Sequence, residues 1–105
     1  MASAHPRRVK TALERIARAL CSHDGLPENT QFEGRPMWES FLPKARIALE
    51  VLREPTQEMS EAGAEIIRNV GADESPEAHR SDASNTWRFM IDAALNETNQ
   101  TGGNQ

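Results

Sequence analysis

The stretch SNTWRFMIDAAL, residues 84–95, decides the fold class because its apolar side chains recur at the spacing of an α-helix. At about 100° of rotation per residue, one face of this helix is apolar. The residues on that face are Ala83, Trp87, Met90, Ile91, Ala94 and Leu95. Phe89 points about 160° away from them, among polar residues. The pattern predicts a helix with one side facing a core and a large ring on its polar side.

Three further segments show the same spacing, and together they predict an all-α fold, a small bundle of three to four helices. The first segment runs from about 6 to 22, and the second from about 36 to 53. Pro43 either opens the longer part of the second helix, after a short turn over 36–42, or kinks one continuous helix. The stretch 24–35 between these segments has little periodicity and predicts a loop.

The third segment follows Thr56, which is suited to cap a helix N-terminus, and it ends at Gly71. Gly63 inside this helix costs about 1 kcal/mol relative to Ala, which predicts a close approach by another helix. The fourth helix, which contains the opening stretch, begins at either Ser75 or Ser81. The predicted core stripe of the third segment comprises Met59, Ala62, Gly63, Ile66, Ile67 and Val70.

A length of 105 residues predicts one helical domain over residues 1–97, with a flexible tail over 98–105. Hydrophobic residues make up 37 % and charged residues 27 %, which is typical of globular rather than disordered chains. No apolar run reaches the roughly 20 residues that a membrane span requires. The single cysteine, Cys21, cannot form an internal disulfide, so it predicts a reducing, cytoplasmic setting.

The chain has no motif that predicts catalysis, which argues against an enzyme and against a cofactor. Cys21, His23 and Asp24 are all metal-ligating residue types that lie close together, but a structural zinc site needs about four ligands. No second cysteine follows, nor a paired histidine at suitable spacing, so we expect no metal site. We expect Cys21 to be a half-buried small residue of the first helix.

Basic residues are concentrated at the start of the chain. Residues 1–20 hold five basic and one acidic side chain, a balance of +4, whereas the whole chain carries −4. Arg7, Arg8, Arg15 and Arg18 are therefore the candidates for an alternative function, a regulator that binds nucleic acid through its first helix. The last three are expected on the face opposite the core. A solvated or internally paired face is favoured over nucleic-acid binding, because the chain is acidic overall and no aromatic residue interleaves the arginines.

Three large apolar residues lie off the core-facing stripes: Phe89 on the last helix, and Ile47 and Val51 on the second. Apolar residues that gather on one surface favour a homodimer or another protein partner. Arg88 and Asp92, at i and i+4 beside the Phe89 ring, form either a polar rim or a weak surface pair. The sequence therefore predicts a protein-binding site at Phe89, Arg88 and Asp92, with Ile47 and Val51 as a second patch.

Four stretches carry a likeness to known proteins: ARIALEVLREPT (45–56), WRFMIDAAL (87–95), IARALC (16–21) and MW (37–38). In these stretches the chain resembles short uncharacterised helical proteins encoded by phages and prophages of proteobacteria, and the likeness spans residues 9–97. The resemblance implies a small accessory protein made inside a bacterial host cell, where it binds a host or rival protein and modulates it. The similar proteins tend to have a small residue where Phe89 stands, so the resemblance does not extend to that position.

Overall fold

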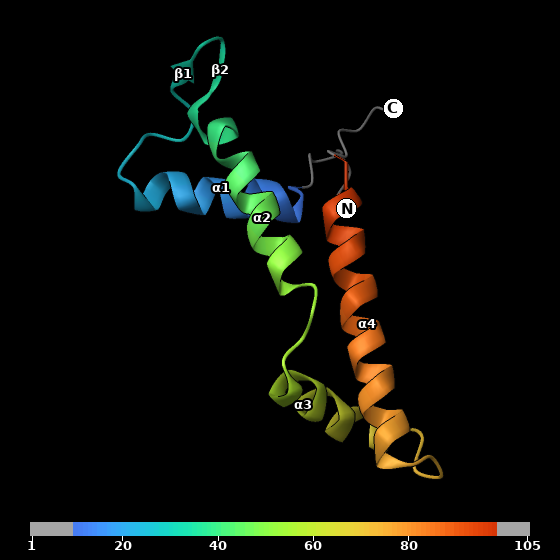
Figure 1. Cartoon of the computed structure of the whole chain (residues 1–105). Coiled ribbons are helices and arrows are strands. Elements are labelled where there is room, and N and C mark those ends of the chain that lie inside the picture. Colours follow the sequence, from blue (N-terminus) through green and yellow to red (C-terminus); the bar gives the residue numbers. More distant parts are fainter. Residues whose placement is uncertain (1–9, 99–105) are drawn as a thin grey trace, which may run out of the picture. The chain divides into compact units, whose positions relative to one another are not determined.

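The structure is a computed structural model that describes residues 10–98. These residues form four α-helices: α1 (Ala12–His23), α2 (Leu42–Leu52), α3 (Gln57–Arg68) and α4 (Pro76–Asn96) (Figure 1). Two short strands, β1 (Gln31–Phe32) and β2 (Arg35–Pro36), precede a 3-10 helix, η1 (Met37–Phe41). The predicted all-α fold class is confirmed. Arg7, Arg8 and the predicted tail beyond residue 98 lie outside the described residues.

The described residues divide into two compact units. The first unit holds residues 10–48 and 94–98, and the second unit holds residues 49–93. Both α2 and α4 contribute residues to each unit, because the division falls at 48/49 and at 93/94. The single domain expected over 1–97 stays a prediction.

Helix α1 begins later than the sequence pattern predicts. Thr11 is the N-cap, with extended backbone angles, and its hydroxyl accepts a hydrogen bond from the Glu14 N–H at 3.0 Å. An N-cap residue satisfies an otherwise unpaired N–H of the first turn, and it stands outside the helix that it caps. Residue 10 is therefore not helical. The helix ends at His23, one residue beyond the expected end.

The core of the first unit lies where α1 packs against η1 and the start of α2. Its buried members are Ala17, Cys21, Trp38, Phe41 and Ala45. Cys21 is fully buried, rather than half-buried as expected from the sequence. Trp38 is buried beside it. Burial raises the pKa of the Cys21 thiol, because a low-dielectric environment disfavours the thiolate.

Part of the stretch expected to be a loop is a small β-hairpin. Strands β1 and β2 pair antiparallel, with Phe32 opposite Arg35. Glu33 and Gly34 form the two-residue connection, and both have positive φ angles, 52° and 81°. Two-residue hairpins favour such turns because their twist matches that of the flanking strands. The sequence of 24–35 did not indicate this hairpin, because Glu-Gly is a weaker turn signal than Asn-Gly or Asp-Gly.

Pro43 opens a helix rather than kinking one. Helix α2 starts at Leu42, directly after η1, so Pro43 lies in the first helical turn. The N–H groups of a first turn have no partner within the helix, and proline therefore removes no bond there. The first of the two sequence alternatives is confirmed.

Both helices of the second unit are capped by hydroxyl groups. The Thr56 hydroxyl accepts a hydrogen bond from the Met59 N–H at 3.1 Å, as the sequence predicts. The Ser75 hydroxyl accepts one from the Ala78 N–H at 3.1 Å, so α4 begins at the earlier of its two predicted starts. A ring nitrogen of the buried His79, in the first turns of α4, lies 2.6 Å from the Gly71 carbonyl oxygen. This contact holds the α3–α4 connection against α4.

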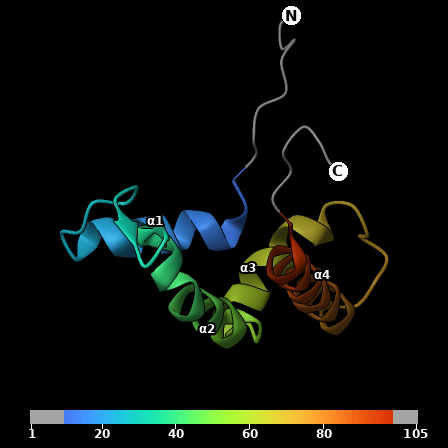
Figure 2. The same ribbon diagram turned by 90° about the horizontal axis from the view of Figure 1, so that it is seen from above.

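Helices α3 and α4 meet through their smallest residues. Figure 2 shows α3 beside α4, and the Ser60 and Ser84 hydroxyls are hydrogen-bonded at 2.7 Å. A Cβ atom placed on Gly63 would lie only 2.9 Å from the Ala83 Cβ. Carbon atoms at optimal separation lie about 3.5–4.0 Å apart, so this contact admits no further atom. The close approach predicted at Gly63 is confirmed.

We expect Gly63→Ala to lower the free energy of unfolding by about 1–2 kcal/mol, because the overpacking cost exceeds the roughly 1 kcal/mol gained in helix propensity. The measurement is urea unfolding followed by circular dichroism. Ala83→Gly removes the opposing Cβ, so in that background the same substitution should be neutral or stabilising. A Gly63→Ala single variant that is more stable than the parent would contradict the close approach.

Candidate protein-binding surface

Helix α3 leaves its apolar face largely uncovered. No residue of α3 is buried, and Ile66 is 69 % exposed. Val70, in the turn that follows, is 88 % exposed. The expectation that the α3 stripe forms core is therefore wrong at these two positions. Ser60 and Gly63 are in contact with α4, and a contact at these positions leaves the side chains of Ile66 and Val70 in solvent.

An apolar groove follows the α3–α4 contact. Its α3 side includes Met59 and Ile66, and its α4 side includes Thr86, Trp87 and Met90. The Trp87 indole N–H donates to the Leu52 carbonyl oxygen at 2.6 Å, which fixes the ring at the side of the groove. Met90 is 60 % exposed although the sequence places it on the core-facing stripe. Most of the groove lining is hydrocarbon, so it favours apolar contacts over polar chemistry.

Phe89 extends this apolar surface beyond the groove. Its side chain is 72 % exposed, as the helical spacing predicts. Thr86, three residues earlier on α4, lines the groove, and residues three apart are neighbours on a helix surface. The groove together with Ile66, Phe89 and Met90 is called the α3–α4 surface below.

Arg88 and Asp92 bind the end of α2 to α4. The Arg53 guanidinium donates to both Asp92 carboxylate oxygens, at 2.7 and 3.1 Å. The Arg88 guanidinium donates to the Glu54 carboxylate at 2.9 Å. The hydrogen bonds from Arg53 lower the pKa of Asp92, and those from Arg88 lower the pKa of Glu54. Arg88 and Asp92 therefore hold α4 against the end of α2, and their charged groups are paired within the second unit rather than left open around Phe89.

The sequence pattern did not indicate the partners Arg53 and Glu54. They lie at the break between α2 and α3. Arg53 precedes its partner Asp92 by 39 residues, and Glu54 precedes its partner Arg88 by 34 residues. A pairing at that separation has no local signal. The only hint is that Arg53, Glu54, Arg88 and Asp92 together offer two cations and two anions.

The second predicted patch is exposed on α2. Ile47 and Val51 lie one helical turn apart, and both side chains are mainly in solvent. Ile47 belongs to the first unit and Val51 to the second. Each is therefore an exposed apolar position of its own unit.

Arg18 does not face solvent as the alternative function requires. Its guanidinium donates to Glu14 at 2.7 Å and to Glu28 at 3.0 Å, and it lies 4.8 Å from the centre of the Trp38 ring. Burial alone lowers the pKa of Arg18, and the hydrogen bonds to the two carboxylates outweigh that effect and raise it. Arg15 is exposed, so it is the one residue of the predicted basic set that the structure places in solvent within residues 10–98.

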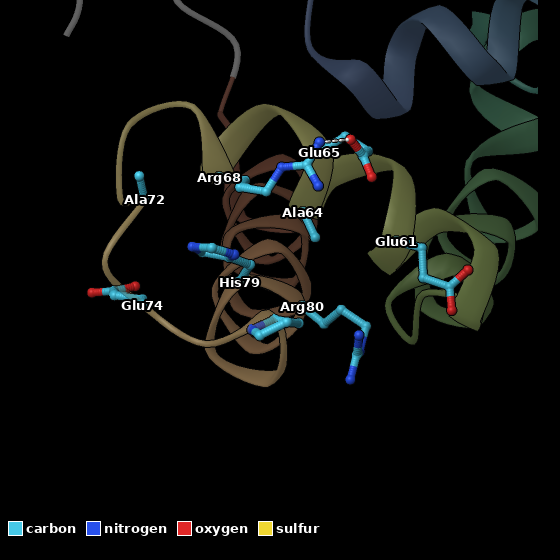
Figure 3. Close-up of a pocket in the computed structure, with 9 residues that line it drawn as sticks. Glu61, Ala64, Glu65, Arg68, Ala72, Glu74, His79 and Arg80 are labelled. Carbon is cyan, nitrogen blue, oxygen red and sulfur yellow. Dashed lines mark hydrogen bonds and ion pairs between the residues drawn. The ribbon is translucent and has the colours of Figure 1, made fainter.

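A second pocket, of about 340 Å³, lies at the other side of the α3–α4 contact (Figure 3). Arg68, Glu74, His79 and Arg80 line it, and Figure 3 shows the His79 ring between α3 and the turn that precedes α4. Its volume is at the lower end of the range for small-molecule sites, roughly 300–1,000 Å³. Arg68 is paired with Glu65, and His79 with a backbone carbonyl, so these groups are already satisfied.

Two further observations concern the part of the chain that the structure describes. Within it, no three His, Cys, Asp or Glu side chains are grouped so that they could hold a metal ion. None of its helices combines the length and the apolar character that crossing a membrane demands. Comparisons with protein-family models, with curated proteins and with solved structures find no match to this chain.

The buried charge of Glu14 yields a prediction for the first unit. Glu14 is 1 % exposed and Arg18 depends on it, so Glu14→Ala should lower the free energy of unfolding by about 2–3 kcal/mol. The matched control is Glu39→Ala, which removes the exposed i,i+4 pair with Arg35 and should cost less than about 0.5 kcal/mol. Equal losses in urea unfolding would show that Glu14 has no special role.

The clamp between α2 and α4 predicts a dependence of stability on pH. Because Asp92 and Glu54 have lowered pKa values in the folded chain, their contribution is fully present above their unfolded values of about 4. It is lost as the pH falls through the folded values. Asp92→Asn should make the decline in stability between about pH 5 and pH 3 shallower. An NMR titration that places the pKa of Asp92 at or above about 3.9 would contradict the clamp.

Proposed function

We propose that this protein acts stoichiometrically, by binding a protein partner through the α3–α4 surface. The observation that carries the proposal is that α3 is amphipathic and yet has no buried residue. Moving large apolar side chains out of water lowers the free energy by about 25 cal/mol per Å² of apolar surface buried. Ile66, Phe89 and Met90 are exposed, and Ile66 and Met90 line a groove of the same apolar character, so a second protein surface can supply the burial that the chain does not.

Within this proposal, Arg88 and Asp92 are positioning residues. Their ion pairs hold α4 against the end of α2, which keeps Phe89 on the outer side of the helix. Ile47 and Val51 are further contact positions. A second copy of the chain is one form that the partner can take.

The setting that we propose is the cytoplasm of a bacterial host cell, where the protein inhibits or modulates a host or defence complex. This setting is what the resemblance of residues 45–56 and 87–95 to phage and prophage proteins implies. A thiol at Cys21 that is buried and unbridged is in keeping with a reducing compartment.

Phe89→Asp tests the proposed surface, because a charge there opposes burial but leaves the fold intact at so exposed a position. We expect partner affinity, or self-association measured by light scattering, to fall at least about tenfold. Ile66→Asp should act in the same direction. Partners are isolated by affinity capture from the bacterial host and identified by mass spectrometry.

Phe32→Asp is the matched control, because Phe32 is also an exposed phenylalanine but lies in the first unit. It should leave binding unchanged. If Phe89→Asp keeps a native circular dichroism spectrum and binds every partner as the parent does, the α3–α4 surface is not the binding site.

A further inference from the structure

The second unit carries a charge that its own residues do not neutralise. Residues 49–93 contain ten acidic and four basic side chains, a formal charge of −6 with His79 neutral. All four arginines are already engaged with carboxylates. The pairs are Arg53 with Asp92, Arg68 with Glu65, Arg80 with Glu77, and Arg88 with Glu54. Any further cation near this unit must therefore come from elsewhere.

Two of the remaining carboxylates lie outside the groove lining, on the two helices that form the groove. On α3, Glu58, Ala62 and Ile66 follow one another at i, i+4 and i+8, so they share one side of the helix. Glu58 forms no ion pair among the described residues, and Ile66 lines the groove. The Glu58 carboxylate therefore lies about two helical turns from Ile66, toward the start of α3.

Helix α4 repeats the arrangement. Asp82, Thr86 and Phe89 lie at i, i+4 and i+7, on one side of the helix. Asp82 forms no ion pair within residues 10–98, and Thr86 lines the groove. Each helix that forms the groove thus carries, outside the groove lining, a carboxylate without an ion pair in the described part of the chain, and none of the four arginines of the second unit is among the lining residues.

We propose that the occupant of the α3–α4 groove is a cationic amphipathic helix of the partner protein. This inference rests on the proposed function and gives it a chemical class of partner. Apolar residues at i, i+3 or i+4, and i+7 of that helix enter the groove, and flanking Lys or Arg side chains meet Glu58 and Asp82. A helix fits better than an extended segment, because it satisfies its own backbone N–H and C=O groups inside an apolar groove that has no strand edge.

The test titrates the full-length chain with three fluorescent peptides of about 18 residues, long enough to form a helix. One carries leucine at helical spacing with lysine elsewhere, the second has glutamate in place of lysine, and the third is the lysine peptide with its order scrambled. We expect the first peptide to bind at least about tenfold more tightly than either of the others. Its affinity should fall as salt is added, because salt screens exposed charges.

Matched variants separate local charge from total charge. Glu58→Gln with Asp82→Asn should weaken binding of the leucine–lysine peptide about fivefold and flatten its dependence on salt. Asp73→Asn with Glu74→Gln makes the same change in net charge in the α3–α4 connection, outside the groove lining, and should alter affinity less than about twofold. Ile66→Ser should weaken binding about tenfold. Circular dichroism confirms that each variant remains folded.

Three outcomes would overturn the inference. Equal binding of the lysine and glutamate peptides, each weakened by Ile66→Ser, leaves the apolar docking surface standing and removes the cationic partner. If the Glu58/Asp82 variant and the Asp73/Glu74 variant weaken binding of the leucine–lysine peptide equally, the peptide is attracted by the net charge of the chain and not by carboxylates near the groove. A concentration-dependent dimer that Ile66→Ser abolishes and no peptide displaces identifies a second copy as the occupant. If Ile66→Ser and Phe89→Asp leave all peptide binding and self-association unchanged, the proposed function fails as well.

Discussion

The approach of α3 to α4 at Gly63 is the contact on which the second unit depends. With Ala83 opposite and a Cβ on Gly63 excluded by a 2.9 Å separation, the helices meet at their narrowest side chains. The Ser60–Ser84 hydrogen bond fastens the same crossing. To one side of this contact lie the larger apolar side chains Met59, Ile66, Trp87 and Met90. They form the walls of the groove, so the packing of the unit and its apolar surface arise at the same crossing.

The end of α2 determines which side of α4 faces outward. Arg53 and Glu54 pair with Asp92 and Arg88, and the Trp87 indole donates to a carbonyl at the C-terminal end of α2. These links engage three positions on one side of α4. At about 100° per residue, Phe89 lies about 160° from Trp87 and about 60° from Asp92, so its ring points away from the Trp87 side of the helix. The individual ion pairs are exposed and each contributes little, but together they define a rotation of the helix about its axis.

The two units use their charges in opposite ways. In the first unit, Arg18 contacts Glu14, Glu28 and the Trp38 ring. A cation that the sequence places on a basic face is therefore paired within the unit. In the second unit, the arginines are all engaged and a surplus of carboxylates remains at the surface. The second unit therefore attracts positively charged partners. The groove adds the apolar contact that long-range attraction does not provide.

The sequence by itself determined the features that arise within one or two helical turns. These include the helical segments, the Thr56 cap, the need for a small residue at position 63, and the outward direction of Phe89. Each follows from spacing along a single helix or from hydrogen bonds over three or four residues. Only the tertiary structure decided which apolar stripe is covered. Ile66 carries the same helical signal as a core residue, and its exposure depends on where α4 crosses α3. The partners of Arg88 and Asp92 were decided in the same way, because pairings between residues more than thirty positions apart leave no periodic trace in the chain.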